Sequence, residues 1–377
     1  MNQTTAGPTP GGPASEGGRK IQKVVLPGQT PWGEYILNVL VKRSYEIVPG
    51  GRCVRAESDQ KLNPGDAHYG DPMNSTVKLE SDFIPWKVAT DVVLNGKAYA
   101  PRGEPTPALT AALAVGPSRK EIRVIGDRLC RHRPGRDPLF TDPMPFTEME
   151  LRYERAYGGV DIASDPKVSC PYPRNPLGRG FVVGTGKGAI EGLALPNLED
   201  PGDLLTPARL PAGQCLNWAR QPLPQGFGWY AKSWQPRAAL AGVMPADRPF
   251  EQELRRAYAR TVPPDQLALY EQTRLPDMDF RFFNGASLGL ALPTLDGDEM
   301  VGLSGLAPEG VLTFQRPGDH PRIGLDIGMG IQDPPVVLHT VMIRMEDRQL
   351  VLVWRAAAAY PGPDWLPGIR KMEALIL

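Results

Sequence analysis

The chain has 377 residues, of which 41% are hydrophobic and 22% charged, a composition typical of a soluble globular protein with one large core or two smaller ones. Lys and Arg together number 42, as do Asp and Glu, so no overall field draws the chain to nucleic acid or to an anionic membrane. We therefore expect a partner that is neither. The 41 Gly and 42 Pro favour many short strands over long helices.

The first 20 residues, MNQTTAGPTPGGPASEGGRK, are rich in Gly, Pro, Ser and Thr. They hold too little apolar surface to offset the entropy cost of ordering, so we expect a flexible tail over residues 1–20. They also lack the apolar centre of a secretory signal, and no later stretch reaches the roughly 18 apolar residues of a membrane span. These features predict a cytoplasmic location.

The cysteines are widely separated and form no CxxC motif. This spacing is typical of unpaired thiols in a reducing compartment. We therefore expect no disulfide among them: Cys53, Cys130, Cys170 and Cys215.

Residues 21–164 are predicted to form an N-terminal β region. The run YILNVLVKRSYEIV from Tyr35 is β-branched and aromatic, stops at Pro49-Gly50-Gly51 and resumes as RCVRAES, which predicts a hairpin. Turn residues, among them Asn95-Gly96 and Gly116-Pro117, separate further strand-like runs. These runs cover residues 76–84, 87–95, 108–115 and 121–129.

Residues 165–275 are predicted to be a loop-rich and helical segment. Gly and Pro dominate its first part, and a pair of short helices is expected near 250–273, where FEQELRRAYART is followed by DQLALYEQ. Large aromatic residues are common anchors at interfaces. We expect most rings of this segment to bind a partner and Trp234 to be buried. The expected partner-binding residues are Trp218, Phe227, Trp229, Tyr258 and Tyr270.

Residues 276–377 return to strand-like patterns and are predicted to be a C-terminal β region. Runs at 300–306, 310–317 and 322–328 precede a hairpin, in which 336–345 and 349–356 flank the turn Glu346-Asp347-Arg348. The two β regions could form one compact domain. The predicted fold is mainly β, with antiparallel sandwich-like or barrel-like sheets, long Pro/Gly-rich loops and the short helical pair.

Candidate catalytic and metal motifs are weak. GTGKG at 184–188 lacks the first Gly and the Ser or Thr of a phosphate-binding loop. Cys130 and His132 could supply two metal ligands, which are too few for a zinc site. Acidic pairs such as Asp66 and Asp71 lie beside Gly or Pro, where Asp is a common turn former. We therefore expect no catalytic residues, no metal and no cofactor.

The segment YERAYGGVD places charges among apolar and aromatic neighbours. A charge that points inward from a strand persists only when it is paired, so we expect Glu154 and Arg155 to form a buried structural ion pair. Gly158 and Gly159 fit a corner with positive φ. Two further arginines, flanked by glycine or aromatic residues, are expected to stack or to bind backbone carbonyls: Arg179 and Arg237.

A set of short motifs resembles one bacterial family, the type VI secretion effector adaptors catalogued as domain of unknown function 2169. The resemblance covers residues 31 to about 360. It includes HYGDPMNSTVKLESDFIPWKVATDVVL from His68, YERAYGGVD, NPLGRGF at 175–181, LPNLEDP at 195–201, PxGFG at 224–228, WxPR at 234–237, DFRFFNGA at 279–286 and GDE at 297–299. After WxPR the chain departs from the family pattern, because AGVMP at 241–245 stands where relatives commonly have AGTYD.

The resemblance implies an adaptor or chaperone that binds a secreted toxin effector and helps to load it onto the spike of a type VI secretion system. The expected partners are the toxin and a spike protein, VgrG or PAAR. The family implies neither ATP nor metal and offers no catalytic positions to carry over. The alternative is a hydrolase that uses carboxylates of the Pro/Gly-rich middle region.

Overall fold

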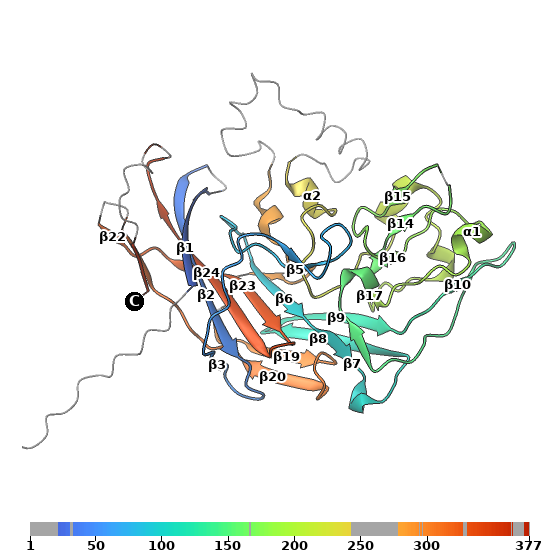
Figure 1. The fold of residues 1–377 in the computed structure, drawn as a ribbon, viewed down its shortest axis with the longest axis horizontal. Helices are drawn as coiled ribbons and strands as arrows, with labels where there is room; N and C mark the ends of the chain where they lie inside the picture. The colour runs from blue at the N-terminus through green and yellow to red at the C-terminus, as the bar shows by residue number, and fades with distance from the viewer. Residues whose placement is uncertain are drawn as a thin grey trace, which may run out of the picture.

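The protein is mainly β, as the sequence predicts, and several antiparallel sheets make up most of its regular structure. A computed structural model describes residues 22–30, 33–165, 167–242, 278–293, 295, 297–326, 330–362, 364 and 373–376. The predicted tail at 1–20 and the predicted helical pair near 250–273 lie outside these residues. Figure 1 shows the sheets in the middle of the molecule and a loop-rich lobe that carries α1 at one end.

The largest sheet combines strands from both ends of the chain in the order β1-β2-β24-β23-β6-β18, and β3 pairs with β2. All neighbours are antiparallel except β23 and β6, which run parallel. The strands are β1 (Gln22–Gln29), β2 (Tyr35–Glu46), β3 (Val54–Arg55), β6 (Thr90–Asn95), β18 (Ala291–Leu292), β23 (Val336–Arg344) and β24 (Gln349–Ala359).

A second antiparallel sheet has the order β17-β9-β8-β19-β20. One hydrophobic cluster includes Val92 and Leu352 of the large sheet together with Leu113 and Phe314 of the second, so the two sheets pack face to face as a sandwich. The described strands close no barrel. The strands are β8 (Ala108–Val115), β9 (Ser118–Ile125), β17 (Leu198–Glu199), β19 (Met300–Ser304) and β20 (Val311–Gln315).

Short elements connect and cover the two sheets. Paired strands are β4 (Ala67–His68) with β5 (Val77–Leu79), β7 (Lys97–Tyr99) with β12 (Glu148–Glu150), β10 (Cys130–Arg131) with β11 (Leu139–Phe140), β13 (Tyr157–Gly158) with β16 (Arg179–Gly180), β14 (Val160–Asp161) with β15 (Cys170–Pro171), and β21 (Ile323–Asp326) with β22 (Ile331–Gln332) and β25 (Glu373–Ile376). Helical turns are η1 (Pro101–Gly103), η2 (Tyr153–Arg155), α1 (Lys187–Ile190), η3 (Pro207–Arg209), η4 (Cys215–Arg220), α2 (Arg237–Leu240) and η5 (Phe280–Phe283). None of the described helices is long and apolar enough to cross a membrane.

Residues 56–89, here called the covering segment, lie against the large sheet through polar contacts. Lys42 of β2 pairs with Asp82 at 2.7 Å, and Lys87 pairs with Asp91 of β6 at 2.7 Å. The guanidinium of Arg355 from β24 stacks 4.0 Å from the centre of the Trp86 ring. A buried charge is tolerated only when it is paired, so these contacts fix one position for the covering segment on the sheet.

The loop-rich lobe has its own small core, to which Tyr172 and Leu210 contribute. Within it a disulfide joins Cys170 of β15 to Cys215 of η4, with Cα atoms 5.9 Å apart. The expectation of no disulfide is therefore wrong for this pair, whereas Cys53 and Cys130 are free and buried. The two partners lie 45 residues apart, and only the folding of the intervening loops brings them together.

The disulfide should stabilise the folded protein in oxidising buffer. Closing a loop of this length lowers the entropy of the unfolded chain, which corresponds to about 2–4 kcal/mol. We expect the double variant Cys170→Ser, Cys215→Ser to lose that much free energy of unfolding in a urea titration without reductant. With dithiothreitol present, variant and wild type should unfold at the same urea concentration. Equal stability without reductant would contradict the prediction.

His339 should make the stability depend on pH. Its side chain is buried, and its Nε2 atom has no hydrogen-bond partner among the described residues. Burial, and then the nearby charges of Lys87 and Arg355, lower the pKa of His339 well below 6.5. The folded state thus binds fewer protons than the unfolded state below about pH 6.5, and the free energy of unfolding decreases as the pH falls below that value.

The free energy of unfolding decreases by up to about 1.4 kcal/mol for each pH unit below that value. Urea titrations at about pH 7.5 and about pH 5.5 measure it. We expect His339→Gln to reduce the difference in free energy of unfolding between these two conditions, whereas the control His68→Gln keeps the wild-type difference. An unchanged pH dependence in His339→Gln would show that another group is responsible.

Candidate functional site

Two motif segments far apart in the sequence lie side by side at the edge of the large sheet. Trp229 and Ala286 form an antiparallel bridge, and the backbone N–H of Tyr230 donates to the carbonyl of Gly285 at 2.7 Å. PxGFG and WxPR therefore adjoin DFRFFNGA, although about fifty residues separate them in the chain.

Asp91 of β6 holds the DFRFFNGA segment in place through hydrogen bonds to its buried carboxylate. Its fully buried carboxylate accepts hydrogen bonds from the Asn284 amide at 3.0 Å and from the backbone N–H groups of Gly285 and Ala286 at 3.0 and 3.3 Å. Lys87 supplies the compensating charge and also donates to the Thr340 hydroxyl at 3.1 Å. The pair of Lys87 and Asp91 thus links β6, β23, the covering segment and the DFRFFNGA segment.

Arg237 of the WxPR motif holds the same region from the other side. Its guanidinium donates to the carbonyls of Tyr230 at 2.5 Å and Phe282 at 2.8 Å, and it pairs with the buried Glu80 of the covering segment at 2.5 Å. Planar donors in a fork suit such a set of acceptors. Arg237 is itself buried, so the side chain joins α2, η5 and the covering segment.

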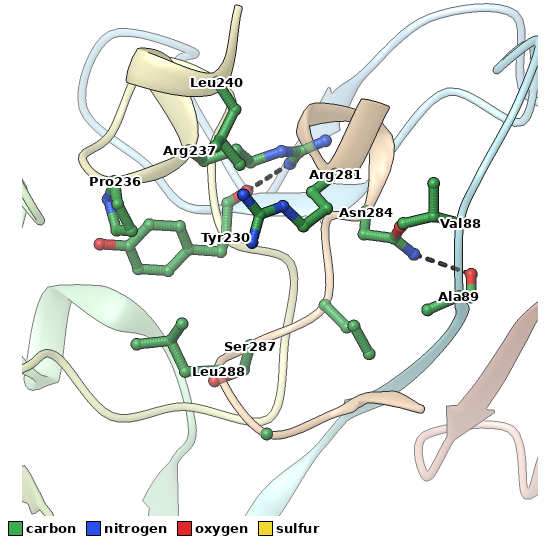
Figure 2. Close-up of a pocket in the computed structure, with 13 residues that line it drawn as sticks. Val88, Ala89, Tyr230, Pro236, Arg237, Leu240, Arg281, Asn284, Ser287 and Leu288 are labelled. Atoms are coloured by element: carbon green, nitrogen blue, oxygen red, sulfur yellow. Dashed lines mark hydrogen bonds between the residues drawn. The ribbon is translucent and has the colours of Figure 1, made fainter. Parts of the chain in front are cut away.

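These segments line a pocket of about 290 Å³ that opens to the surface, here called the motif pocket. Figure 2 shows Tyr230 from one segment of the pocket wall, and Arg281 and Asn284 from the segment of η5. Most of the wall is aliphatic or aromatic. Two apolar side chains at the pocket, Val88 and Leu288, are 51% and 41% exposed. The lining residues are Val88, Ala89, Tyr230, Pro236, Arg237, Leu240, Arg281, Asn284, Ala286, Ser287, Leu288, Gly289 and Ala291.

The polar groups of the motif pocket are few. The Oδ1 atom of Asn284 is buried and has no donor within the described part of the chain, whereas its Nδ2 atom donates to the Ala89 carbonyl at 2.8 Å. Arg281 at the surface pairs with Asp279 at 2.5 Å. A mostly apolar pocket with so few polar groups suits an apolar side chain.

Lys120 of β9 fixes the loop that forms the floor of the motif pocket. Its ammonium donates to the Ser287 hydroxyl at 2.6 Å and to the Leu288 carbonyl at 2.7 Å. Loss of hydration lowers the pKa of Lys120 to about 7. The second sheet therefore supports the pocket through this side chain.

The aromatic residues expected to bind a partner are mostly buried. Trp218, Phe227 and Trp229 are 7%, 0% and 4% exposed, so the expectation that these rings are available at the surface is wrong. Trp218 packs in the small core of the lobe, Phe227 in the sandwich core, and Trp229 against Val77 and Val93. Tyr258 and Tyr270 lie outside the described residues.

The three rings turn inward because their segment pairs with other chain segments and fills the space beside the sheet. Leu94, for example, donates its backbone N–H to the Phe227 carbonyl at 2.9 Å. Trp234 is buried against Tyr153 and Tyr230 in edge-to-face contacts, with ring centres 5.3 Å apart in both cases.

Glu154 and Arg155 do not pair with each other, contrary to the expected buried ion pair. Glu154 accepts a hydrogen bond from the backbone N–H of Thr76 at 2.7 Å, and Arg155 lies 3.4 Å from Asp127. The two residues form the turn η2 rather than a strand, so their side chains leave in different directions. Both are partly exposed.

Gly158, Gly159 and Arg179 hold backbone segments together where the chain enters the loop-rich lobe. Gly158 and Gly159 have φ values of +149° and +108°, and a Cβ on Gly158 would lie 2.1 Å from the Asn175 carbonyl oxygen. Arg179 donates through Nε to the carbonyl of Glu154 at 3.0 Å. These residues hold backbone segments together rather than line the motif pocket.

Acidic groups in and just before the middle region take part in structural hydrogen bonds. Asp161 accepts hydrogen bonds from the Ser164 hydroxyl and from the backbone N–H of Val183, the latter at 2.7 Å. Burial alone would raise the pKa of Asp161, but the Ser164 hydroxyl and the backbone N–H groups lower it below its usual value. Glu199 pairs with Arg128, and burial raises the pKa of Glu199. Within the described ranges, no group of three or more His, Cys, Asp or Glu side chains could hold a metal ion.

Comparison with known proteins identifies one family. Residues 33–355 match the family described as "uncharacterized protein conserved in bacteria (DUF2169)". No curated protein and no solved structure matches the chain.

Gly285 should be essential for the motif pocket. A Cβ at this position would lie 2.0 Å from the Glu80 carboxylate and 2.8 Å from the Arg237 guanidinium, both of which are buried. We expect Gly285→Ala to separate this ion pair and to lower the free energy of unfolding by about 3–5 kcal/mol, measured by urea titration. The control Gly188→Ala, which meets no atom within 4 Å, should not destabilise the protein. Equal stabilities would refute the crowding argument.

Proposed function

We propose that this protein, which belongs to the conserved bacterial family of domain of unknown function 2169, is an adaptor that binds a secreted toxin effector. In this proposal it helps to load the toxin onto the VgrG or PAAR spike of a type VI secretion system. The motif resemblance supports this proposal. The observation that carries it is the motif pocket, whose wall includes residues from three of the segments that carry the resemblance: the segment from His68, WxPR and DFRFFNGA.

The pocket has the properties of a docking site for a protein. It is open to the surface, mostly apolar, and has Val88 and Leu288 exposed beside it, so a partner's apolar side chain gains burial there. Asp91 and Arg237 hold the walls through buried hydrogen bonds, and a pre-organised site loses less entropy on binding. Cytoplasmic loading, before export, is part of this proposal.

No particular carboxylate of the described residues supports the hydrolase alternative. Glu199, a buried carboxylate of the middle region, and Asp161, which lies just before that region, already accept hydrogen bonds from backbone N–H groups. Neither lines the motif pocket.

Deletion of the gene in its native host tests the adaptor function. We expect one toxin to disappear from the culture medium while VgrG is still exported, because the proposal gives the adaptor a role in loading the toxin and none in exporting the spike. Immunoblots of cells and medium measure both proteins, and a copy of the gene on a plasmid should restore export. Unchanged export of every toxin encoded beside the spike genes would refute the proposal.

A surface variant tests whether the motif pocket is the docking site. Leu288→Asp places a charge beside the pocket, and we expect the affinity for the toxin to decrease at least about tenfold, equivalent to about 1.4 kcal/mol. The control Leu216→Asp changes a residue of η4 that is 62% exposed and does not line the pocket. Calorimetry with purified toxin measures both. Equal effects of the two variants would place the docking site elsewhere.

A further inference from the structure

A second pocket, of about 320 Å³, opens on the loop-rich lobe and shares no lining residue with the motif pocket. It lies between the connection from β10 to β11 and the loops around α1 and η3, which Figure 1 shows at one end of the molecule. We call it the lobe pocket. Its charged lining residues are Arg133, Arg136 and Asp137.

A single turn presents both arginines of the lobe pocket. In Arg133-Pro134-Gly135-Arg136 the backbone N–H of Arg136 donates to the Arg133 carbonyl at 3.2 Å, and Gly135 has a φ of +66°. Pro followed by a Gly with positive φ is typical of a type II turn, which brings the first and fourth Cα atoms within about 7 Å of each other. The turn therefore brings two arginines close together, and both of them line the lobe pocket.

These guanidinium groups are available to a ligand. Arg133 donates through Nε to the Asp137 carbonyl at 2.8 Å, which orients the side chain and leaves its two terminal nitrogens free of ion pairs within the described chain. Arg136 pairs with no carboxylate among the described residues, and both side chains are exposed. The neighbouring Arg131, in contrast, is neutralised by Glu191 at 2.9 Å.

The remaining wall indicates which anion fits. Pro138, Pro207 and Pro211 have no backbone N–H, and the N–H of Gly213 already donates to the Val183 carbonyl at 2.9 Å. A phosphate group needs many donors around three or four oxygens, as in Gly-rich loops that supply backbone N–H groups. A carboxylate has two oxygens, which one or two guanidinium groups satisfy. The three proline rings are partly exposed and offer apolar contact to the stem of a glutamate.

From this geometry we infer that the lobe pocket binds the carboxylate side chains of an acidic peptide segment through Arg133 and Arg136. The inference rests on the proposed function only for the identity of the protein that carries this segment, which would be the toxin or a spike protein. Two forked arginines recognise carboxylates with defined geometry, so the pocket adds specificity to the apolar contact at the motif pocket.

Fluorescence anisotropy with a labelled, end-capped hexaglutamate peptide tests the inference on the purified full-length protein. We expect binding that weakens as salt increases, and no binding of a matched hexaglutamine peptide. The double variant Arg133→Gln, Arg136→Gln should weaken hexaglutamate binding at least about tenfold. Because both side chains are exposed, its melting temperature should stay within about 2 °C of wild type. The control Arg322→Gln, an exposed arginine paired with Asp333, should bind as wild type does.

Three results would overturn the inference. Hexaglutamate could bind no better than hexaglutamine, or the double variant could bind it as tightly as wild type. Inorganic phosphate or an oligothymidine could also compete at concentrations at which free glutamate does not, which would assign the arginines to phosphate groups. The assay uses purified protein alone, so its failure is distinct from a failure of the secretion test.

Discussion

The ion pair between Lys87 and Asp91 is the interaction on which the candidate site depends. Asp91 lies in the large sheet with no exposed surface, and its carboxylate is satisfied because Lys87, the side-chain amide of Asn284 and the backbone N–H groups at 285–286 converge on it. Removing either partner would leave a buried charge alone, at a cost of about 3–5 kcal/mol. The position of the DFRFFNGA segment, and hence the shape of the motif pocket, follows from this requirement.

The two faces of the large sheet differ in how much charge they bury. One face packs apolar side chains, such as Val92 and Leu352, against the second sheet. The other face meets the covering segment through the apolar contact of Val93 with Val77 and also through buried ion pairs, including Lys42 with Asp82. Apolar packing supplies most of the free energy of folding, whereas paired charges tolerate only one alignment. The pocket lies where these two kinds of contact meet.

Alternating patterns in the sequence predict the strands well, because a half-buried strand must alternate apolar and polar residues, as Val311–Gln315 do. The pocket and the buried position of Trp229 could not be predicted in this way. They depend on the pairing of Trp229 with Ala286, a contact between distant segments that leaves no local pattern. The disulfide between Cys170 and Cys215 could not be predicted for the same reason. Arg237, in contrast, lies in a motif that the sequence alone singles out.

The parallel pairing of β6 with β23 has a consequence for how the chain folds. Thr90–Asn95 and Val336–Arg344 are neighbours in one sheet, so β6 has no β23 partner until more than two hundred further residues have been synthesised. Contacts of such long sequence separation slow folding, and strands that wait unpaired expose edges on which chains aggregate. During translation the early strands need protection, and a truncated product that lacks β23 and β24 has no route to the native sheet.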